Sequence, residues 1–357
     1  MTRVLIMAGG TGGHVFPALA VANALQQLSV DVNWMGTAQG IEARIVPEAG
    51  ITLHTISIKG LRKNGLKGWL LAPIQLIKAV LEARQVLKTF QPDVVIGLGG
   101  FASGPGGVAS WLMGIPLIIH EQNAIAGLTN RLLAPLAKHV LLGFRDSLSG
   151  KTKGIWVGNP VRRDIEKLPT PAHRYSNAAT AKLLILGGSL GAQSLNQVIP
   201  QAIALLDAEQ RPEILHQCGE KHVAACQSAY RESQVTATVT PFIKDMTEAY
   251  ASADLIICRA GALTVAEVAA AGVAAILVPY PHAVDDHQTL NAKVLCDVGA
   301  AILIADHELN AQRLAAEMKT LFENRPKLLE MATLAREQAK VGSAEQIADL
   351  CLEVAHG

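Results

Sequence analysis

Residues 7–25, MAGGTGGHVFPALAVANAL, carry the clearest fold signal in the sequence. An apolar run, residues 4–6, precedes them and is typical of a buried strand. Four of the five residues 9–13 are glycine, and an apolar stretch with helical spacing follows them. A glycine-rich turn that opens a helix brings backbone N–H groups and the positive helix end close to an anion. The plainer interpretation is a tight turn without a ligand, so this loop needs support from the rest of the chain.

Composition limits the class of protein. The chain has 357 residues, of which 50% are hydrophobic and 17% charged, and a net charge of +1. This predicts about two globular domains of roughly 150–200 residues each and argues against a nucleic-acid-binding protein. The cysteine count is odd and no C-x-x-C occurs, so we expect a reduced chain without a disulfide framework or zinc site. No signal peptide and no apolar run of about 18 residues is found, so any membrane contact is expected to be peripheral.

Short apolar runs alternate with longer amphipathic segments along the first half of the chain. The runs are rich in valine, isoleucine and leucine and end in glycines or polar residues, which is typical of buried parallel strands. The amphipathic segments, such as 17–28 and 70–90, predict helices that cover both faces of the sheet. The predicted strands are RVLIMAGG (3–10), VDVNWMGT (30–37), PDVVIGLGG (92–100) and IPLIIHEQN (115–123).

The second half restarts the same pattern. AKLLILGGSLGAQSLNQ (181–197) is similar to the opening strand, glycine loop and helix, and ADLIICRAGALTVAE (253–267) is similar to PDVVIGLGGFASGP (92–105). We therefore predict two α/β domains of similar topology, 1–158 and 159–341, joined by a proline-rich linker. The tail, 342–357, has a helical pattern and could pack back on either domain. Ligands of open parallel sheets bind at the carboxyl ends of the strands, where these glycine loops lie.

Two common nucleotide sites do not fit the glycine loops. A P-loop needs a lysine that neither loop supplies, and the dinucleotide fingerprint needs a third glycine where the first loop continues Gly13-His14-Val15. His14 is a candidate general base at the edge of that loop, and the helix N-terminus would favour its uncharged form. A capping or core role is the alternative for His14.

Six stretches resemble the MurG family of bacterial glycosyltransferases. The resemblance implies GT-B architecture, in which two Rossmann-like, doubly wound parallel-sheet domains face each other across a deep cleft. It places the lipid-linked acceptor on 1–158, with 342–357 packing back on it, and the UDP-sugar donor on 159–341. The stretches are MAGGTGGHVFPALAVA, LGGFASGPGG, HEQNAIAGLTNRLLA, VGNPVRRDI, GGSLGAQSLN and RAGALTVAEVAAAG, in this order between residue 7 and about residue 291.

The same resemblance implies an inverting transfer of N-acetylglucosamine from UDP to the 4-hydroxyl of the muramyl-pentapeptide pyrophosphoryl-undecaprenol, lipid I, giving lipid II for peptidoglycan synthesis. It implies no cofactor and no metal, and a peripheral position on the cytoplasmic face of the bacterial inner membrane. Two other classes stay open on residues alone. One is an isomerase like the UDP-N-acetylglucosamine 2-epimerases, and the other is a non-catalytic nucleotide-sugar binding protein.

Residue by residue, the resemblance places Glu267 on the two ribose hydroxyls, although Thr264-x-x-Glu267 also fits a helix capping box. We hypothesise that His14 is the base that takes the acceptor proton. Relatives differ at His287 and Ala260, which puts sugar contacts there in doubt. The predicted donor-binding residues are Thr11, Gly12, Gly13, Asn123, Arg162, Ser189, Ile243, Ala262, Leu263, Thr264, Val265, Ala266, Glu267 and Gln288. The predicted acceptor-binding residues are Gly10, Gly100, Ser103 and Glu121.

One segment, LKGWLLAPIQLIKAVLEARQVLK (66–88), leaves two interpretations open. Its apolar side chains recur at helical spacing, which usually marks the buried face of a helix. Basic residues flank them, so the alternative is a patch that meets an anionic membrane surface. The apolar residues are Trp69, Leu70, Ile74, Ile77 and Leu81, and the basic ones are Lys63, Lys67, Lys78 and Arg84.

Overall fold

The computed structural model describes residues 1–58, 65–148, 153–175, 180–188 and 191–357. The chain divides into two compact units. Unit 1 comprises Met1–Val161 and Gly342–Gly357, and unit 2 comprises Arg162–Val341. The chain thus passes from unit 1 to unit 2 three residues after Gly158, and it returns to unit 1 at the start of the tail.

Unit 1 is built around a seven-stranded sheet with the order β3-β2-β1-β4-β5-β6-β7, in which every neighbouring pair is parallel. The strands are β1 (Arg3–Met7), β2 (Asp31–Gly36), β3 (Thr52–Thr55), β4 (Val94–Gly97), β5 (Leu117–Glu121), β6 (His139–Leu142) and β7 (Ile155–Trp156). The helices of this unit are α1 (Gly12–Gln27), α2 (Glu42–Glu48), α3 (Gly65–Phe90), α4 (Ser103–Leu112), α5 (Leu128–Leu133) and α15 (Ser343–His356).

Both faces of this sheet are buried, which explains the unbroken apolar runs of the strands. On β1, Val4 and Ile6 pack into one core with residues of α1 and α15, such as Val21 and Ile347. Leu5 and its neighbour two residues on pack into a second core with residues of α3, α4 and α5. Alternate residues of a strand point to opposite faces, so a strand covered on both sides must be apolar throughout.

Unit 2 contains a six-stranded parallel sheet with the order β10-β9-β8-β11-β12-β13. Its strands are β8 (Lys182–Leu186), β9 (Glu213–Gln217), β10 (Thr238–Thr240), β11 (Leu255–Cys258), β12 (Ala274–Leu277) and β13 (Ala301–Leu303). Its helices are α6 (Arg163–Glu166), α7 (Pro171–Arg174), α8 (Gln193–Ala204), α9 (Val223–Glu232), α10 (Met246–Ser252), α11 (Ala262–Ala271), α12 (His287–Cys296), α13 (Ala311–Phe322) and α14 (Arg325–Glu337).

The two sheets have the same strand order when each is numbered from its own first strand, namely 3-2-1-4-5-6 for the first six strands. This is the Rossmann order, in which ligands bind at the carboxyl ends of the two central strands where the winding reverses. These strands are β1 and β4 in unit 1 and β8 and β11 in unit 2. The predicted fold class, two Rossmann-like parallel-sheet domains, is confirmed, and each predicted glycine loop follows one of these four strands.

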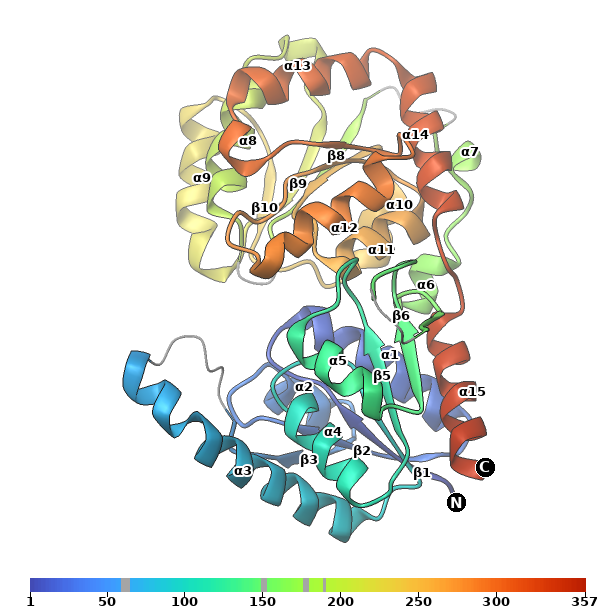
Figure 1. Cartoon of the computed structure of the whole chain (residues 1–357). Helices are drawn as coiled ribbons and strands as arrows, with labels where there is room; N and C mark the ends of the chain where they lie inside the picture. The colour runs from blue at the N-terminus through green and yellow to red at the C-terminus, as the bar shows by residue number, and fades with distance from the viewer. Residues whose placement is uncertain (59–64, 149–152, 176–179, 189–190) are drawn as a thin grey trace. The chain divides into compact units, whose positions relative to one another are not determined.

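The tail forms α15, which packs on α1 within unit 1. The two chain ends lie close together (Figure 1), and the Thr2 hydroxyl is 2.9 Å from Nε2 of His356. Among the described residues, every helix is too short or too polar to span a bilayer.

Candidate active site

The first glycine loop is the N-terminus of a helix. Thr11 is the N-cap of α1, with an extended backbone at φ −118° and ψ 162°, and Gly12 and Gly13 are the first two helical residues. The N–H groups of a first helical turn have no partner inside the helix. They point along the positive end of the helix dipole and suit an anion. The prediction of an amide-lined loop thus holds in its backbone geometry.

A buried carboxylate that the sequence analysis missed supports this loop. Glu42 of α2 is fully buried and accepts hydrogen bonds from the Gly10 N–H at 2.9 Å and from the Thr37 N–H and hydroxyl at 3.0 and 2.7 Å. A β-carbon on Gly9 or Gly40 would overlap this carboxylate. The amide of Gly10 is therefore already used inside the protein. A contact from Gly10 to the lipid-linked acceptor substrate would have to come from its other backbone atoms.

The second glycine loop follows β4 and lies directly against the first. Gly99 and Gly100 both have positive φ, +96° and +86°, which favours glycine. A β-carbon on Gly100 would overlap the backbone of Gly9, and one on Gly99 would overlap the His14 ring. Ser103 is buried, and its hydroxyl donates to the carbonyls of Met7 at 3.1 Å and Gly99 at 2.8 Å. That hydroxyl links the ends of β1 and β4. A contact from Ser103 to the lipid-linked acceptor substrate would therefore use its backbone.

His14 lies on α1 one residue after the glycines and is half-buried. Its Nδ1 is 2.7 Å from Oε1 of Gln122, which follows β5. The amide nitrogen of Gln122 donates to the carbonyl of Leu98 at 3.0 Å. The candidate base is therefore held where the ends of β1, β4 and β5 meet, at the winding reversal of unit 1.

The loop after β5 is organised by Glu121. Its buried carboxylate accepts from the N–H and side-chain amide of Asn123, from the N–H of Gly127 and from the side-chain amide of Asn130, at 2.9, 3.2, 3.0 and 2.8 Å. Carboxylates with several such donors hold a loop in one conformation. The carboxylate of Glu121, predicted to bind acceptor, is thus committed to its own loop. The side chain of Asn123 is half-buried in that loop.

The segments HEQN and VGNPVR, which carry the most specific part of the family resemblance, are hydrogen-bonded to each other. Nε2 of buried His120 donates to the carbonyl of Gly158 at 2.9 Å, and the Asn159 side-chain amide donates to the carbonyl of Gln122 at 3.0 Å. Burial lowers the pKa of His120, although its hydrogen bond to Gly158 and the charge of Glu121 oppose this shift. His120 is therefore a neutral structural donor.

In unit 2, Glu267 is a buried carboxylate in the middle of α11. The Tyr250 hydroxyl donates to it at 3.1 Å. Burial raises the pKa of Glu267, while the charge of Arg162 and the hydrogen bond from Tyr250 act in the opposite direction. The structure thus brings Arg162 and Glu267, two predicted donor-binding residues, into electrostatic contact.

The capping-box interpretation of Thr264 and Glu267 is wrong. The N-cap of α11 is Gly261, and the helix begins at Ala262. Thr264 is therefore the third helical residue and cannot cap the helix. Glu267 lies three residues further on and is held instead by Tyr250.

The other predicted donor-binding residues of unit 2 differ in exposure. Side chains of Ile243 and Val265 are buried, so ligand contacts there would come from the backbone. Ala262, Leu263 and Thr264 form the first turn of α11, where backbone N–H groups suit an anion, and Ala266 lies in the second turn. Ser189 lies outside the residues that the structure describes.

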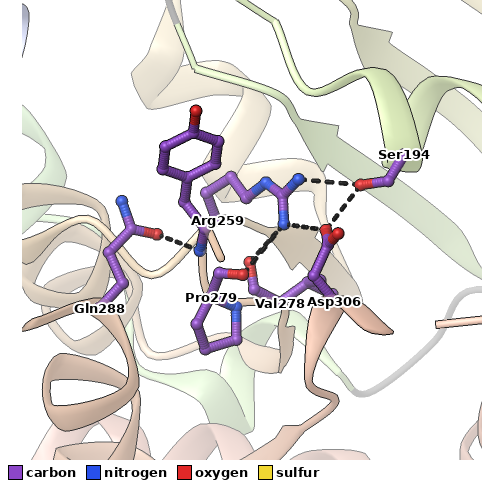
Figure 2. Close-up of polar contacts among 7 residues, drawn as sticks. Ser194, Arg259, Val278, Pro279, Gln288 and Asp306 are labelled. Atoms are coloured by element: carbon purple, nitrogen blue, oxygen red, sulfur yellow. Dashed lines mark hydrogen bonds and ion pairs between the residues drawn. The ribbon is translucent and has the colours of Figure 1, made fainter. Parts of the chain in front are cut away.

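A polar cluster that the sequence did not reveal lies at the end of β11 (Figure 2). The guanidinium of Arg259, just after β11, forms an ion pair with Asp306 and donates to Oγ of Ser194 at 2.8 Å and to the carbonyls of Val278 and Pro279. It therefore ties the ends of β11 and β12 to the first turn of α8 and to the segment after β13.

Gln288, at the start of α12, lies next to this cluster in Figure 2. Its Oε1 accepts from the N–H of Tyr280 at 2.8 Å. Because the amide oxygen faces this backbone donor, the amide nitrogen is the group that Gln288 can offer to a ligand. His287 precedes it on the same helix.

Three candidate metal ligands are nowhere grouped together among the residues that the structure describes.

Comparisons with known proteins agree with this geometry. The glycosyltransferase family 28 N-terminal domain matches residues 4–142, and the C-terminal domain of the same family matches residues 182–347. The first match lies within unit 1, and the second covers most of unit 2 and runs into α15. The fold and the loops at the strand ends thus define a glycosyltransferase of the GT-B type.

Individual relatives indicate the activity more specifically than the two family domains do. The chain is 55% identical over 357 residues to the UDP-N-acetylglucosamine--N-acetylmuramyl-(pentapeptide) pyrophosphoryl-undecaprenol N-acetylglucosamine transferase of Chromohalobacter salexigens, with 99% of this chain and 97% of that protein covered. The protein of the same name from Nitrosococcus oceani is 52% identical, with 99% of each chain covered. The crystal structure of Acinetobacter baumannii MurG matches with a TM-score of 0.85 at 43% identity, covering 99% of this chain and 100% of that one. The chain belongs to the MurG family and is an N-acetylglucosaminyltransferase.

The isomerase interpretation receives no comparable support. The UDP-GlcNAc 2-epimerase from Neisseria meningitidis matches with a TM-score of 0.67 at 13% identity. A likeness at this identity reflects a shared fold, and folds of this kind host many functions.

Proposed function

We propose that this chain transfers N-acetylglucosamine from UDP-N-acetylglucosamine to the 4-hydroxyl of the N-acetylmuramyl-pentapeptide pyrophosphoryl-undecaprenol. The names of its relatives give this donor and this acceptor, without the hydroxyl, for those proteins. The observation that carries the chemistry is the position of His14. It lies at the winding reversal of unit 1, against the Gly99 loop and one residue after the glycines of the Gly12 loop.

Unit 1 would bind the lipid-linked acceptor, and unit 2 would bind the donor. In unit 1 the amides of Gly12 and Gly13 at the start of α1, predicted to contact the donor, suit a phosphate. In unit 2 Glu267, whose pKa the charge of Arg162 lowers, and the start of α11 suit a nucleotide. Glu267 would accept hydrogen bonds from both ribose hydroxyls, as ionised carboxylates do well.

The reaction would be a single displacement. His14 Nε2 takes the proton of the acceptor's 4-hydroxyl while the hydroxyl oxygen forms a bond to the anomeric carbon of the donor. The bond between that carbon and the β-phosphate oxygen breaks, and its electron pair leaves with UDP. The charge developing on UDP would be stabilised by helix-end amides and Arg162, together with Ser189, which lies outside the described residues.

The donor sugar would be recognised by Gln288 and by Asn123 of unit 1. Gln288 has its amide oxygen occupied by the Tyr280 N–H, so it would donate to sugar oxygens through Nε2. Ile243 would offer backbone groups to uracil, since its side chain is buried.

The described part of α3 supports a peripheral place on the cytoplasmic face of the inner membrane. Ile74, Ile77 and Leu81 are 64%, 61% and 57% exposed, so for these residues the buried-helix-face interpretation is wrong. We call these three residues the α3 apolar patch. Lys78 and Arg84 are exposed on the same helix, and an apolar surface with basic neighbours suits anionic lipid. The side chains of Trp69, Leu70 and Lys67, and all of Lys63, lie outside what the structure describes.

Transfer of labelled N-acetylglucosamine from UDP to a short-chain analogue of the muramyl lipid tests this function. We expect labelled disaccharide lipid and one UDP released per sugar transferred. Donor incubated alone should yield no 2-epimer. UDP-sugar binding without UDP release in the presence of acceptor would contradict the proposal and favour a binding protein.

A further inference from the structure

Gln122 contacts the candidate base from the loop after β5 and is almost fully buried. We infer that Gln122 is a positioning residue that fixes the tautomer of His14, so that Nε2 is the nitrogen able to accept the acceptor's proton. This inference rests on the proposed function, because the tautomer matters for turnover only if His14 is the base.

The orientation of the Gln122 amide follows from its second hydrogen bond. Its Nε2 donates to the carbonyl oxygen of Leu98 at 3.0 Å, while its Oε1 is 2.7 Å from Nδ1 of His14. If the amide were turned over, its oxygen would face the carbonyl oxygen of Leu98 with no proton between them. The network therefore assigns Oε1 to the side of His14.

The tautomer of His14 follows from that orientation. An amide oxygen only accepts hydrogen bonds, so Nδ1 of His14 must carry the proton between them. In a neutral imidazole one nitrogen is a donor and the other an acceptor, and the partner of one decides the state of the other. Nε2 then carries the lone pair that general-base catalysis requires.

The surrounding backbone holds Gln122 in place. Its carbonyl accepts from the Asn159 side-chain amide at 3.0 Å, and the neighbouring Glu121 carboxylate accepts from the next N–H along the chain, that of Asn123, at 2.9 Å. On the other loop, Gly99 leaves no space for a β-carbon beside the ring. The imidazole is thus fixed by a neutral partner, which orients it without placing a negative charge at Nδ1.

Nitrogen NMR of the full chain tests the tautomer directly. With ¹⁵N-labelled histidine, the His14 signals are assigned by their loss in His14→Gln. Two-bond proton–nitrogen correlations at alkaline pH should show a protonated Nδ1 and an unprotonated Nε2. Gln122→Met keeps the side-chain length but removes the acceptor, so it should move His14 towards the Nε2–H tautomer. An Nε2–H tautomer in the unmodified chain would overturn the inference.

A second amide–imidazole pair in unit 1 provides a matched control. The amide of Asn33 on β2 is 2.9 Å from Nε2 of His54 on β3. Asn33→Leu should change the signals of His54 and leave those of His14 unchanged. Turnover by Asn33→Leu should also be unchanged, because this pair lies outside the glycine loops.

Kinetics test whether the tautomer matters. Gln122→Met should lower kcat by about 10- to 100-fold, with the KM for UDP-N-acetylglucosamine unchanged within about twofold. Gln122→Glu keeps an acceptor oxygen and should restore part of kcat. Its carboxylate favours the imidazolium, so the acidic limb of the kcat profile should move to higher pH. If Gln122→Met does not fold, this pH shift decides the question.

Failure of the inference and failure of the proposed function can be told apart. Unchanged tautomer or unchanged kcat in folded Gln122→Met, or an unmoved pH profile in Gln122→Glu, overturns the role of Gln122 and leaves His14 as a base. Full turnover by His14→Ala would instead rule out His14 as the general base, whatever the NMR signals show.

Discussion

Gly99 packs so closely on the imidazole of His14 that a β-carbon at position 99 would overlap Nδ1. Gly99→Ala should therefore displace His14 and lower kcat at least 10-fold, because small displacements of a catalytic group are costly. Gly114 is the matched control, since it also has positive φ (+68°) but has no other atom within 4 Å of the point where a β-carbon would lie. Gly114→Ala should cost about 1–2 kcal/mol of stability, by urea unfolding, and leave kcat unchanged. Equal kcat values in the two variants would contradict the close packing.

His14→Ala should abolish most turnover while donor binding persists. General-base catalysis contributes about 10²- to 10⁴-fold, so kcat should fall by that factor. UDP affinity, measured by calorimetry, should change less than threefold, because the residues predicted to hold the uracil and ribose lie in unit 2. A variant that lost UDP affinity but kept kcat would reverse the assigned role.

Glu267→Gln should weaken donor binding and stabilise the fold at neutral pH. The glutamine keeps one acceptor oxygen for two ribose hydroxyls, so the KM for the donor should rise about 10-fold or more. The pKa of Glu267 is raised by burial. The contribution of this carboxyl group to the unfolding free energy is thus fully present below its pKa in the unfolded chain. It is lost as pH rises through its pKa in the folded chain. The gain in unfolding free energy in Glu267→Gln should be larger at pH 7.5 than at pH 4, and a gain confined to pH 4 would contradict this sign.

His216 should make unit 2 sensitive to acid. It is fully buried, with Nδ1 2.9 Å from the Tyr230 hydroxyl and Nε2 3.0 Å from Oδ1 of Asn196, and burial lowers its pKa to about 3. Because its pKa is lowered by folding, His216 contributes to the unfolding free energy above its pKa in the unfolded chain, about 6.5. This contribution is lost as pH falls towards 3. Between these limits the unfolding free energy should fall by up to about 1.4 kcal/mol per pH unit from this group.

Urea unfolding of unit 2 between pH 7 and pH 5 measures this slope. His216→Gln should unfold with a flatter pH dependence than the unmodified chain, whatever its stability at pH 7. His173→Gln changes an exposed histidine of the same unit and should leave the slope as it is. Parallel slopes for His216→Gln and the unmodified chain would remove His216 as the cause.

The α3 apolar patch should govern binding to anionic vesicles. Ile77→Asp together with Leu81→Asp should reduce sedimentation with phosphatidylglycerol vesicles at least 10-fold, because both side chains are largely exposed and their burial in lipid is lost. Leu205→Asp in unit 2 changes a leucine of equal exposure, 57%, and should leave vesicle binding unchanged. Equal loss of vesicle binding in both variants would show that the added negative charge, and not the α3 apolar patch, causes the loss.

Much of the fold could be predicted because the signal is local and repeated. A strand, a glycine loop and a helix occur near the start of each half, and a second strand with glycines follows in each. In the structure these are β1 and β4 in one sheet and β8 and β11 in the other, the central strands of the same strand order. The proline cluster predicted a domain boundary at residue 158, and the two units divide after Val161. The role of His14, drawn from a histidine beside glycines, stays a prediction.

The supporting residues could not be predicted, because their partners are distant in the chain. Glu42 has the appearance of an ordinary helical glutamate, and only the fold brings it to Gly10, 32 residues away. Arg259 and Asp306 meet across 47 residues. The capping box failed for a local reason, since glycine can itself be an N-cap and Gly261 starts the helix before Thr264.

Because the chain leaves unit 1 after Val161 and rejoins it at Gly342, unit 2 is an insertion within a discontinuous domain. Ile347, Ala348 and Cys351 of α15 are fully buried in the core beside α1. A fragment that stops at residue 161 would therefore leave an open hydrophobic groove where α15 belongs and should aggregate. Excision of residues 162–341 with a short flexible splice would keep that helix, and it is the way to prepare unit 1 by itself.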